Sequence, residues 1–336
     1  MTVPLRFLSL SILVLGVAAV GRGEQPSSIR AKWHMPPHCT PFDPPRIKDL
    51  KEELHQTGYR LVIAIHPAPP PGSKGDPPPR DLYLLNADGT GLKQLTNTPD
   101  REEHVPRTSP DGTKFTYNFG DYLVDVKTLK TRQIDGAYVW TPDGKRTAQC
   151  VKGGIVFTDV ETGKRTGPVP MPRNISLADM SYDGEWFIFE IRDYLGSKYS
   201  IDFISSKGGE IRKMPNHPVK AGECHPGFSP DGKWMCWNSG DSLSVRKFDP
   251  SLPGGTDGKI VTLPKELIGQ DPCGRWSHCG RYIAYTKIPH AGSWRVHSPI
   301  CIVRLADAAT ITISPPGWLG HHWDYDWLPP AEEEAK

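Results

Sequence analysis

One four-residue phrase recurs along the chain and constrains its fold more than any other feature. It reads Ser-Pro-Asp-Gly at 109–112 and 229–232, Thr-Pro-Asp-Gly at 141–144, Ser-Tyr-Asp-Gly at 181–184 and, in a degraded form, Ser-His-Cys-Gly at 277–280. Successive copies begin 32, 40, 48 and 48 residues apart. Recurrence at a period of roughly 40 residues is typical of proteins built from repeated structural units. We therefore predict a repeat architecture.

The phrase has the composition of a tight turn between two strands. Proline suits the second position of a type I turn, aspartate the third, and glycine the left-handed position that closes a hairpin. Aromatic and β-branched residues follow each turn, as in Glu185–Phe189 and Arg281–Tyr285, and indicate strands. A second hairpin follows each first one, most clearly at Leu82–Thr96. Two hairpins make four strands, which is one blade of a β-propeller.

Counting the hairpins gives the number of blades. Outer hairpins are expected at 82–96, 122–134, 155–166, 201–214, 243–263 and 300–313. The first has only one strand before it, Tyr59–Ile65, whereas Trp323–Pro329 reads like an innermost strand with no blade after it. We predict an all-β, six-bladed propeller over 59–329, with four-stranded antiparallel blades. The C-terminal strand would complete the first blade and close the ring, which leaves no open sheet edge.

These segments resemble a known repeat family. Leu82–Pro99 followed by Ser109–Gly112, and again Glu223–Trp234, are similar to the TolB-type, WD40-like propeller repeat. The resemblance covers about residues 59–329. TolB itself carries an α/β domain ahead of its propeller, and too few residues precede this propeller for such a domain. The resemblance therefore implies the propeller fold and no role that depends on that domain.

The segments outside the propeller have their own patterns. Arg6 and the apolar run Phe7–Val20 predict a signal peptide over 1–23, and hence export to the periplasm or the medium. Residues 24–58 form a proline-rich arm with one short helix, for which we expect Asp43 as N-cap, Pro44 in the first turn and Gly58 as the stop. We expect this helix to pack on the face that carries the repeated turns. Residues 330–336 form an acidic tail.

Net charge and hydropathy limit the classes of partner, and the number of cysteines limits their pairing. The net charge of +2 gives no electrostatic case for nucleic acid or an anionic membrane, and beyond the N-terminus no apolar run is long enough to span a bilayer. The seven cysteines are odd in number, so at least one has no intramolecular partner. We expect most of them to be buried and unpaired.

The histidines favour one face of the predicted ring. The repeated turns and the outer-hairpin turns share one face, the turn face, and the loops between blades share the other, the loop-rich face. Of nine histidines beyond the arm, only His278 falls on the turn face. Near the starts of innermost strands we expect a channel-mouth site on the loop-rich face, composed of His104, His225, His321, His322, Trp323 and Asp324.

Two functions remain open for that site. The first is a non-catalytic binding protein that recognises a protein, peptide or glycan on the loop-rich face and needs no cofactor. Trp294, Trp318 and Arg107 would contribute to its rim.

The alternative is a metal-dependent polysaccharide lyase. It is implied by a resemblance to oligogalacturonate lyases, which are similar to TolB-type propellers and hold manganese with channel histidines. One divalent cation, Mn²⁺ or Ca²⁺, would be held by His104, His225 and His322, and Arg107 or Lys220 would bind the substrate carboxylate. A serine hydrolase has no support, since Gly227–Gly232 lacks the Gly-x-Ser-x-Gly pattern. We favour the binding protein.

Overall fold

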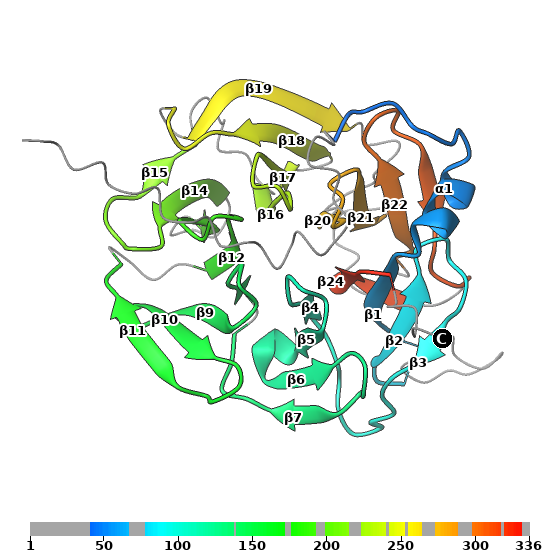
Figure 1. Ribbon diagram of the computed structural model, residues 1–336, viewed down its shortest axis with the longest axis horizontal. Helices are drawn as coiled ribbons and strands as arrows, with labels where there is room; N and C mark the ends of the chain where they lie inside the picture. The colour runs from blue at the N-terminus through cyan, green and yellow to red at the C-terminus, as the bar shows by residue number, and fades with distance from the viewer. Residues whose placement is uncertain are drawn as a thin grey trace, which may run out of the picture.

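Six four-stranded antiparallel sheets form a closed ring around a central axis (Figure 1). The computed structural model describes residues 41–66, 78–137, 139–171, 176–192, 199–214, 223–239, 242–252, 255–263, 273–287, 298–316 and 319–330. The arrangement confirms the predicted six-bladed propeller. The predicted signal peptide, the first part of the arm and the tail after Pro330 lie outside these residues.

Each blade runs from an innermost strand at the channel to an outermost strand at the rim (Figure 1). The strands of blades 1 to 3, in that order, are β24 (Leu319–Leu328), β1 (Arg60–His66), β2 (Asp81–Asn86), β3 (Lys93–Gln94); β4 (Arg107–Thr108), β5 (Lys114–Tyr117), β6 (Tyr122–Asp125), β7 (Thr131–Gln133); β8 (Val139–Trp140), β9 (Arg146–Val151), β10 (Gly154–Asp159), β11 (Arg165–Val169). Those of blades 4 to 6 are β12 (Ser176–Met180), β13 (Trp186–Arg192), β14 (Tyr199–Ser205), β15 (Arg212–Lys213); β16 (Glu223–Phe228), β17 (Trp234–Ser239), β18 (Leu243–Phe248), β19 (Thr256–Leu263); β20 (Arg275–Trp276), β21 (Tyr282–Thr286), β22 (Ile300–Arg304), β23 (Thr310–Thr312). A 3₁₀ turn, η2 (Asn118–Gly120), follows β5.

The C-terminal strand closes the ring, as predicted. β24 pairs antiparallel with β1, and Trp327 lies opposite Leu61 while Tyr325 lies opposite Ile63. All four side chains are fully buried. They belong to an apolar cluster that also takes in blade 6 and the helix of the arm. The first and last strands of the propeller therefore share one blade, and burial of apolar surface stabilises this closure of the ring.

The serine or threonine that opens the repeated turn phrase uses its hydroxyl to stabilise the turn. In the first copy the Ser109 hydroxyl donates to the Asp111 carboxylate at 2.6 Å and accepts the Lys114 amide at 3.0 Å. Gly112 closes the turn with a φ of 62°. The copies at Thr141, Ser181 and Ser229 make the same hydroxyl–carboxylate contact at 2.5–2.6 Å. Each of these four phrases is thus a turn whose first hydroxyl and aspartate are hydrogen-bonded to each other within the turn.

The helix of the arm begins later than the sequence pattern predicted. α1 spans Leu50–Thr57, and its N-cap is Asp49, whose carboxylate accepts the Glu52 amide at 2.9 Å. The expected cap at Asp43 and first turn at Pro44 are wrong, because a residue that precedes a proline is disfavoured in helical conformation and Pro45 follows Pro44. Gly58 ends the helix with a φ of 65°, as predicted.

Ionic contacts hold the arm on the turn face, where we expected it. The fully buried Arg304 of β22 pairs with Glu53 of α1 and donates to the carbonyls of Ile47 and Lys48 at 2.7 and 2.8 Å. On the other side of the ring joint, His55 contacts Asp88, in the outer turn of blade 1, at 2.7 Å. The helix therefore bridges blades 6 and 1 where the ring closes.

Five cysteines have described side chains. Cys150, Cys236, Cys273, Cys279 and Cys301 are free, and all but the partly exposed Cys150 are buried. Burial raises the pKa of the Cys236 thiol to about 12. No helix among the described residues is long and apolar enough to cross a membrane.

Candidate functional site

The two residues before each of the five turn phrases, together with the equivalent pair of blade 1, which has no turn phrase, form a ring around the channel. We call them the channel pairs, each composed of a first and a second residue. From blade 1 to blade 6 they are Asp326–Trp327, Arg107–Thr108, Val139–Trp140, Asp179–Met180, Gly227–Phe228 and Arg275–Trp276. Each pair lies on the innermost strand of its blade, beside the central axis of the ring (Figure 1).

Two blade junctions are joined by an aspartate. The Asp326 carboxylate accepts the Thr108 amide of the next blade at 2.8 Å and the Thr108 hydroxyl at 3.0 Å. In the same way, Asp179 accepts the Phe228 amide at 2.8 Å. Blades 1 and 4 lie opposite each other in a six-membered ring, so this contact occurs twice with approximate twofold symmetry.

Three other junctions are joined by a tryptophan. The indole N–H of Trp140 donates to the Arg107 carbonyl of the preceding blade at 3.0 Å. Trp276 donates to the Gly227 carbonyl at 3.3 Å, and Trp327 donates to the Arg275 carbonyl at 2.9 Å. An aspartate therefore appears at two of the three junctions where the next blade has no tryptophan to donate; the third, between blades 3 and 4, brings together Val139 and Met180. Each of the five hydrogen-bonded junctions joins the same two positions of neighbouring blades.

A cavity of about 110 Å³ opens inside this ring, toward the turn face. Its lining carries charges of both signs, from Arg107, Arg275, Asp179 and Asp326, together with the rings of Trp140, Trp276 and His278. Space exists because blade 5 contributes Gly227, where blade 2 has an arginine. A Cβ at Gly227 would lie 3.7 Å from the Asp179 carboxylate and 4.0 Å from Trp276, so the wall beside it is open.

Arg275 is the distinctive charge of the cavity. Burial lowers the pKa of its guanidinium, but the negative charges of Asp326 and Asp179 outweigh burial, and the pKa is raised. Its Nε is buried and has no hydrogen-bond partner within the described residues. A buried cation without a hydrogen-bond acceptor is costly, so a ligand that supplied an acceptor would stabilise this group.

Arg107 was expected at the rim of the binding site on the loop-rich face, and the structure places it elsewhere. Arg107 is the first residue of the blade 2 channel pair and is only 6% exposed. Its Nη1 donates to the Pro106 carbonyl at 2.6 Å. It lines the cavity at the turn-face end rather than the rim of the loop-rich face, because β4 carries it into the channel.

Asp324 serves a blade junction rather than an open channel-mouth site. The carboxylate is fully buried, pairs with Arg80, and accepts the Val105 amide at 3.0 Å. Arg80 also donates to Glu102 at 2.6 Å. Asp324 therefore fixes the link between the first two blades, and its buried position corrects the expectation that it would face a ligand.

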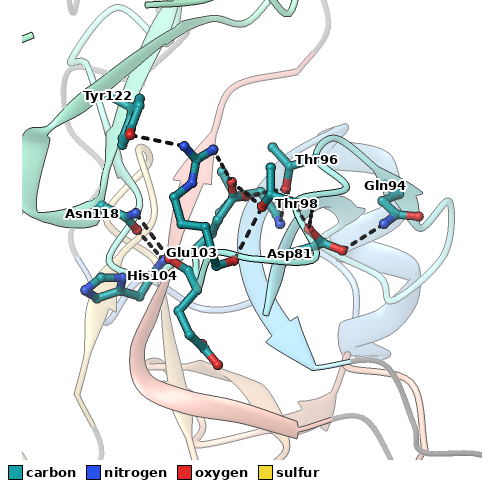
Figure 2. A network of polar contacts seen from close by, with 11 residues as sticks. Asp81, Gln94, Thr96, Thr98, Glu103, His104, Asn118 and Tyr122 are labelled. Atoms are coloured by element: carbon teal, nitrogen blue, oxygen red, sulfur yellow. Dashed lines mark hydrogen bonds and ion pairs between the residues drawn. The ribbon is translucent and has the colours of Figure 1, made fainter. Parts of the chain in front are cut away.

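His104 lies at the edge of a polar network between blades 1 and 2 (Figure 2). Its amide donates to the Asn118 side chain at 2.8 Å, and its ring meets the Phe119 ring edge-on at 5.0 Å. At the centre of the network the buried Glu103 accepts from Thr98 at 3.0 Å and pairs with Arg101 at 3.1 Å. The backbone of His104 thus has a structural role.

The remaining predicted residues are only partly described. The amide of His225 donates to the Glu190 carboxylate at 3.1 Å, and its φ is 54°. For His321, His322 and Trp323 the structure describes the strand but not the side chains, and Trp294, Trp318 and Lys220 lie outside the described residues. Among the side chains that are described, no three His, Cys, Asp or Glu groups are placed to hold a metal ion. The trio of His104, His225 and His322 stays a prediction.

The predicted site was based on histidines, whereas the charges that line the cavity come from arginine and aspartate. The signal was present two residues before each turn phrase, where charged, apolar and glycine residues alternate from blade to blade. Aligning the phrases and comparing that column would have identified Arg107, Asp179 and Arg275 as channel residues.

The comparisons with known proteins agree with the fold. The sequence matches no protein-family model. The fold is similar to the crystal structure of TolB from Acinetobacter baumannii, with a TM-score of 0.58, 19% identity, and coverage of 80% of this protein and 66% of that one. It is also similar to a putative TolB from Agrobacterium tumefaciens, with a TM-score of 0.55, 15% identity, and coverage of 80% and 97%.

A curated sequence relative is the uncharacterized peptidase YuxL of Bacillus subtilis, 26% identical over 151 residues. The match spans 40% of this protein and only 21% of that one. The protein thus has a TolB-like propeller fold, and these similarities extend to the fold alone.

Proposed function

We propose that this protein is an exported, non-catalytic binding protein whose propeller receives a segment of a partner polypeptide at the turn-face end of the channel. The observation that carries this proposal is the cavity, in which fixed charges of both signs and aromatic rings converge from at least five blades. Convergence of a few polar groups in a concave site is the usual mark of a binding site.

The rigidity of the lining supports recognition. Asp179 and Asp326 are held by amides of the following blades at 2.8 Å, and the indoles of Trp140 and Trp276 are held by backbone carbonyls. Side chains fixed in this way lose little conformational entropy when a ligand binds. A closed ring with such a lining suits a preformed binding site.

The size of the cavity suits one side chain or one terminus of a polypeptide. Its volume of about 110 Å³ is smaller than the roughly 300–1,000 Å³ of a site for a drug-sized ligand. We therefore favour one group of a polypeptide over an extended glycan. This moves the binding site from the predicted loop-rich face to the turn face.

Export belongs to the same proposal. It is supported by the basic residue and apolar run of the first 23 residues, which have the pattern of a cleaved signal. The partner would accordingly be a protein of the periplasm, the cell envelope or the medium.

Site-specific photocrosslinking in the native cells tests the proposal. The photoreactive p-benzoylphenylalanine replaces Pro230, which lines the cavity at the second turn position, where another turn carries Tyr182. The matched control position is Val261, 41% exposed on the outermost strand of the same blade. We expect a discrete protein adduct from position 230 that position 261 does not give, and that Gly227→Leu abolishes by filling the cavity. Equal adducts at both positions, or none at 230, would overturn the proposal.

A further inference from the structure

The two carboxylates that line the cavity already accept hydrogen bonds from the protein. Asp326 accepts three hydrogen bonds, from the Thr108 amide and hydroxyl and from the Trp327 amide at 2.9 Å. Asp179 accepts the amides of Phe228 and Met180, both at 2.8 Å. The negative charges of the cavity are therefore already matched by fixed donors from the protein.

The positive charge of Arg275 is not matched in this way. A guanidinium has five N–H donors and no acceptor. Within the described part of the protein the Arg275 guanidinium donates no hydrogen bond, although it lines the cavity and is mostly buried. Asp326 and Asp179 act on it through space. The cavity thus has an excess of donors and needs acceptors from a ligand.

We infer that the cavity binds a carboxylate group of the partner polypeptide, from an acidic side chain or from its C-terminus, with Arg275 as its principal recognition residue. This inference rests on the proposed function and names the group that enters the cavity. A carboxylate matches the planar fork of a guanidinium with two parallel hydrogen bonds. It also supplies the acceptors that the cavity lacks.

The same lining discriminates against other ligands. A phosphate dianion would bring about twice the negative charge close to Asp179 and Asp326, and like charges in one site repel. A neutral amide of the same shape would supply acceptors but no charge to a buried cation. We therefore expect acetate to bind better than inorganic phosphate and much better than acetamide.

Small probes test the chemistry on the purified full-length protein. Sodium acetate is titrated at constant ionic strength, and the indole N–H signal of Trp276, assigned through Trp276→Phe, reports binding by NMR. We expect a saturable shift with acetate that acetamide does not reproduce. Arg275→Gln should weaken acetate binding by about tenfold or more, because a charge-assisted bidentate contact is lost.

Matched variants control for charge and for fold. Arg165→Gln removes the same charge from a surface pair with Asp135 and should leave acetate binding unchanged. Gly227→Ala should bind acetate, because a Cβ has room there, whereas Gly227→Leu should not. Arg275→Gln carries the test if Gly227→Leu fails to fold. An acetate affinity that Arg275→Gln leaves unchanged, or equal shifts with acetamide, would overturn the inference.

The crosslink at position 230 separates this inference from the proposed function. If the adduct persists in Arg275→Gln and is lost in Gly227→Leu, a partner enters the cavity but is not held through a carboxylate. If the adduct persists in Gly227→Leu, the proposed function itself fails. Loss of the adduct in both variants, together with acetate binding, supports both.

Discussion

The junction between blades 1 and 2 and the junction between blades 3 and 4 join equivalent strands by different chemistry. At the first, Asp326 accepts from Thr108, Asp324 pairs with Arg80, and the Glu103 network adds further hydrogen bonds (Figure 2). At the second, the channel pairs bring Val139 and Met180 into one apolar cluster with Leu177 and Phe187. Among the described residues, no hydrogen bond joins Val139 to Met180.

This contrast indicates that neighbouring blades must pack closely, and that either apolar burial or buried hydrogen bonds can hold them together. Apolar burial is non-directional and stabilises by about 25 cal/mol per Å² of surface removed from water. A buried polar junction must satisfy every donor and acceptor, and a single unmatched group costs more than the bond itself gains. The polar junction should therefore be the more sensitive to a single substitution.

The largest effect is expected from Asp324→Ala. It leaves Arg80 without its buried partner and the Val105 amide without an acceptor, and breaking a buried pair costs about 3–5 kcal/mol of unfolding free energy. Urea unfolding measures it. The control is Asp135→Ala, which removes an exposed pair with Arg165 and should cost less than about 1 kcal/mol. Equal losses in the two variants would show that the buried pair contributes nothing special.

The apolar junction should respond next most strongly, to Met180→Ala. Met180 is 5% exposed, and truncating such a side chain to alanine typically costs about 2–5 kcal/mol, depending on how far the cavity collapses. Met180→Leu conserves volume and should cost less than about 1.5 kcal/mol. The same unfolding measurement applies. A leucine variant as unstable as the alanine variant would mean that Met180 contributes more than buried volume.

A smaller loss is expected from Trp140→Phe, which removes one indole hydrogen bond between blades 2 and 3. The Arg107 carbonyl loses its donor at 3.0 Å, and we expect about 1 kcal/mol beyond the change in buried ring area. Trp234→Phe gives the area effect alone, because its indole donates no hydrogen bond to a described residue. Should the two variants lose equal stability, the tryptophan contacts between blades would be incidental.

The smallest expected effect is a pH dependence of the unfolding free energy that arises near the polar junction and not at the apolar one. Burial, followed by the charge of Glu103, raises the pKa of Tyr117 to about 12 in the folded protein. The unfolded protein therefore releases this proton first, and the contribution of Tyr117 is lost as pH rises from about 10. Tyr117→Phe should flatten the fall of unfolding free energy between about pH 10 and about pH 12. Val139, Leu177 and Met180 do not titrate, so Met180→Leu should leave that slope unchanged. Identical slopes in the wild type and Tyr117→Phe would contradict the assignment.

Particular residues show how far prediction from the sequence extends. Ser109–Gly112 and its copies predicted five of the six blades, because a turn phrase and its flanking strands are local features. Asp49 was missed as the helix cap because two aspartates precede the helix and the sequence pattern did not separate them. Asp324 was mistaken for a channel-mouth residue because nothing near it in sequence shows that Arg80 would cover it.

The six-bladed ring, its closure by the C-terminal strand and the face on which the arm packs could all be predicted from the amino-acid sequence. These features follow from the spacing of the repeated turn phrase and from the apolar pattern of the strands, both of which can be read along the sequence. Which charged groups meet became evident only in the folded protein: Arg275 with Asp179 and Asp326 in one cavity, and Arg304 with Glu53 under the helix. Side chains that meet across a ring come from blades far apart in sequence, and their pairing depends on packing that no local pattern encodes.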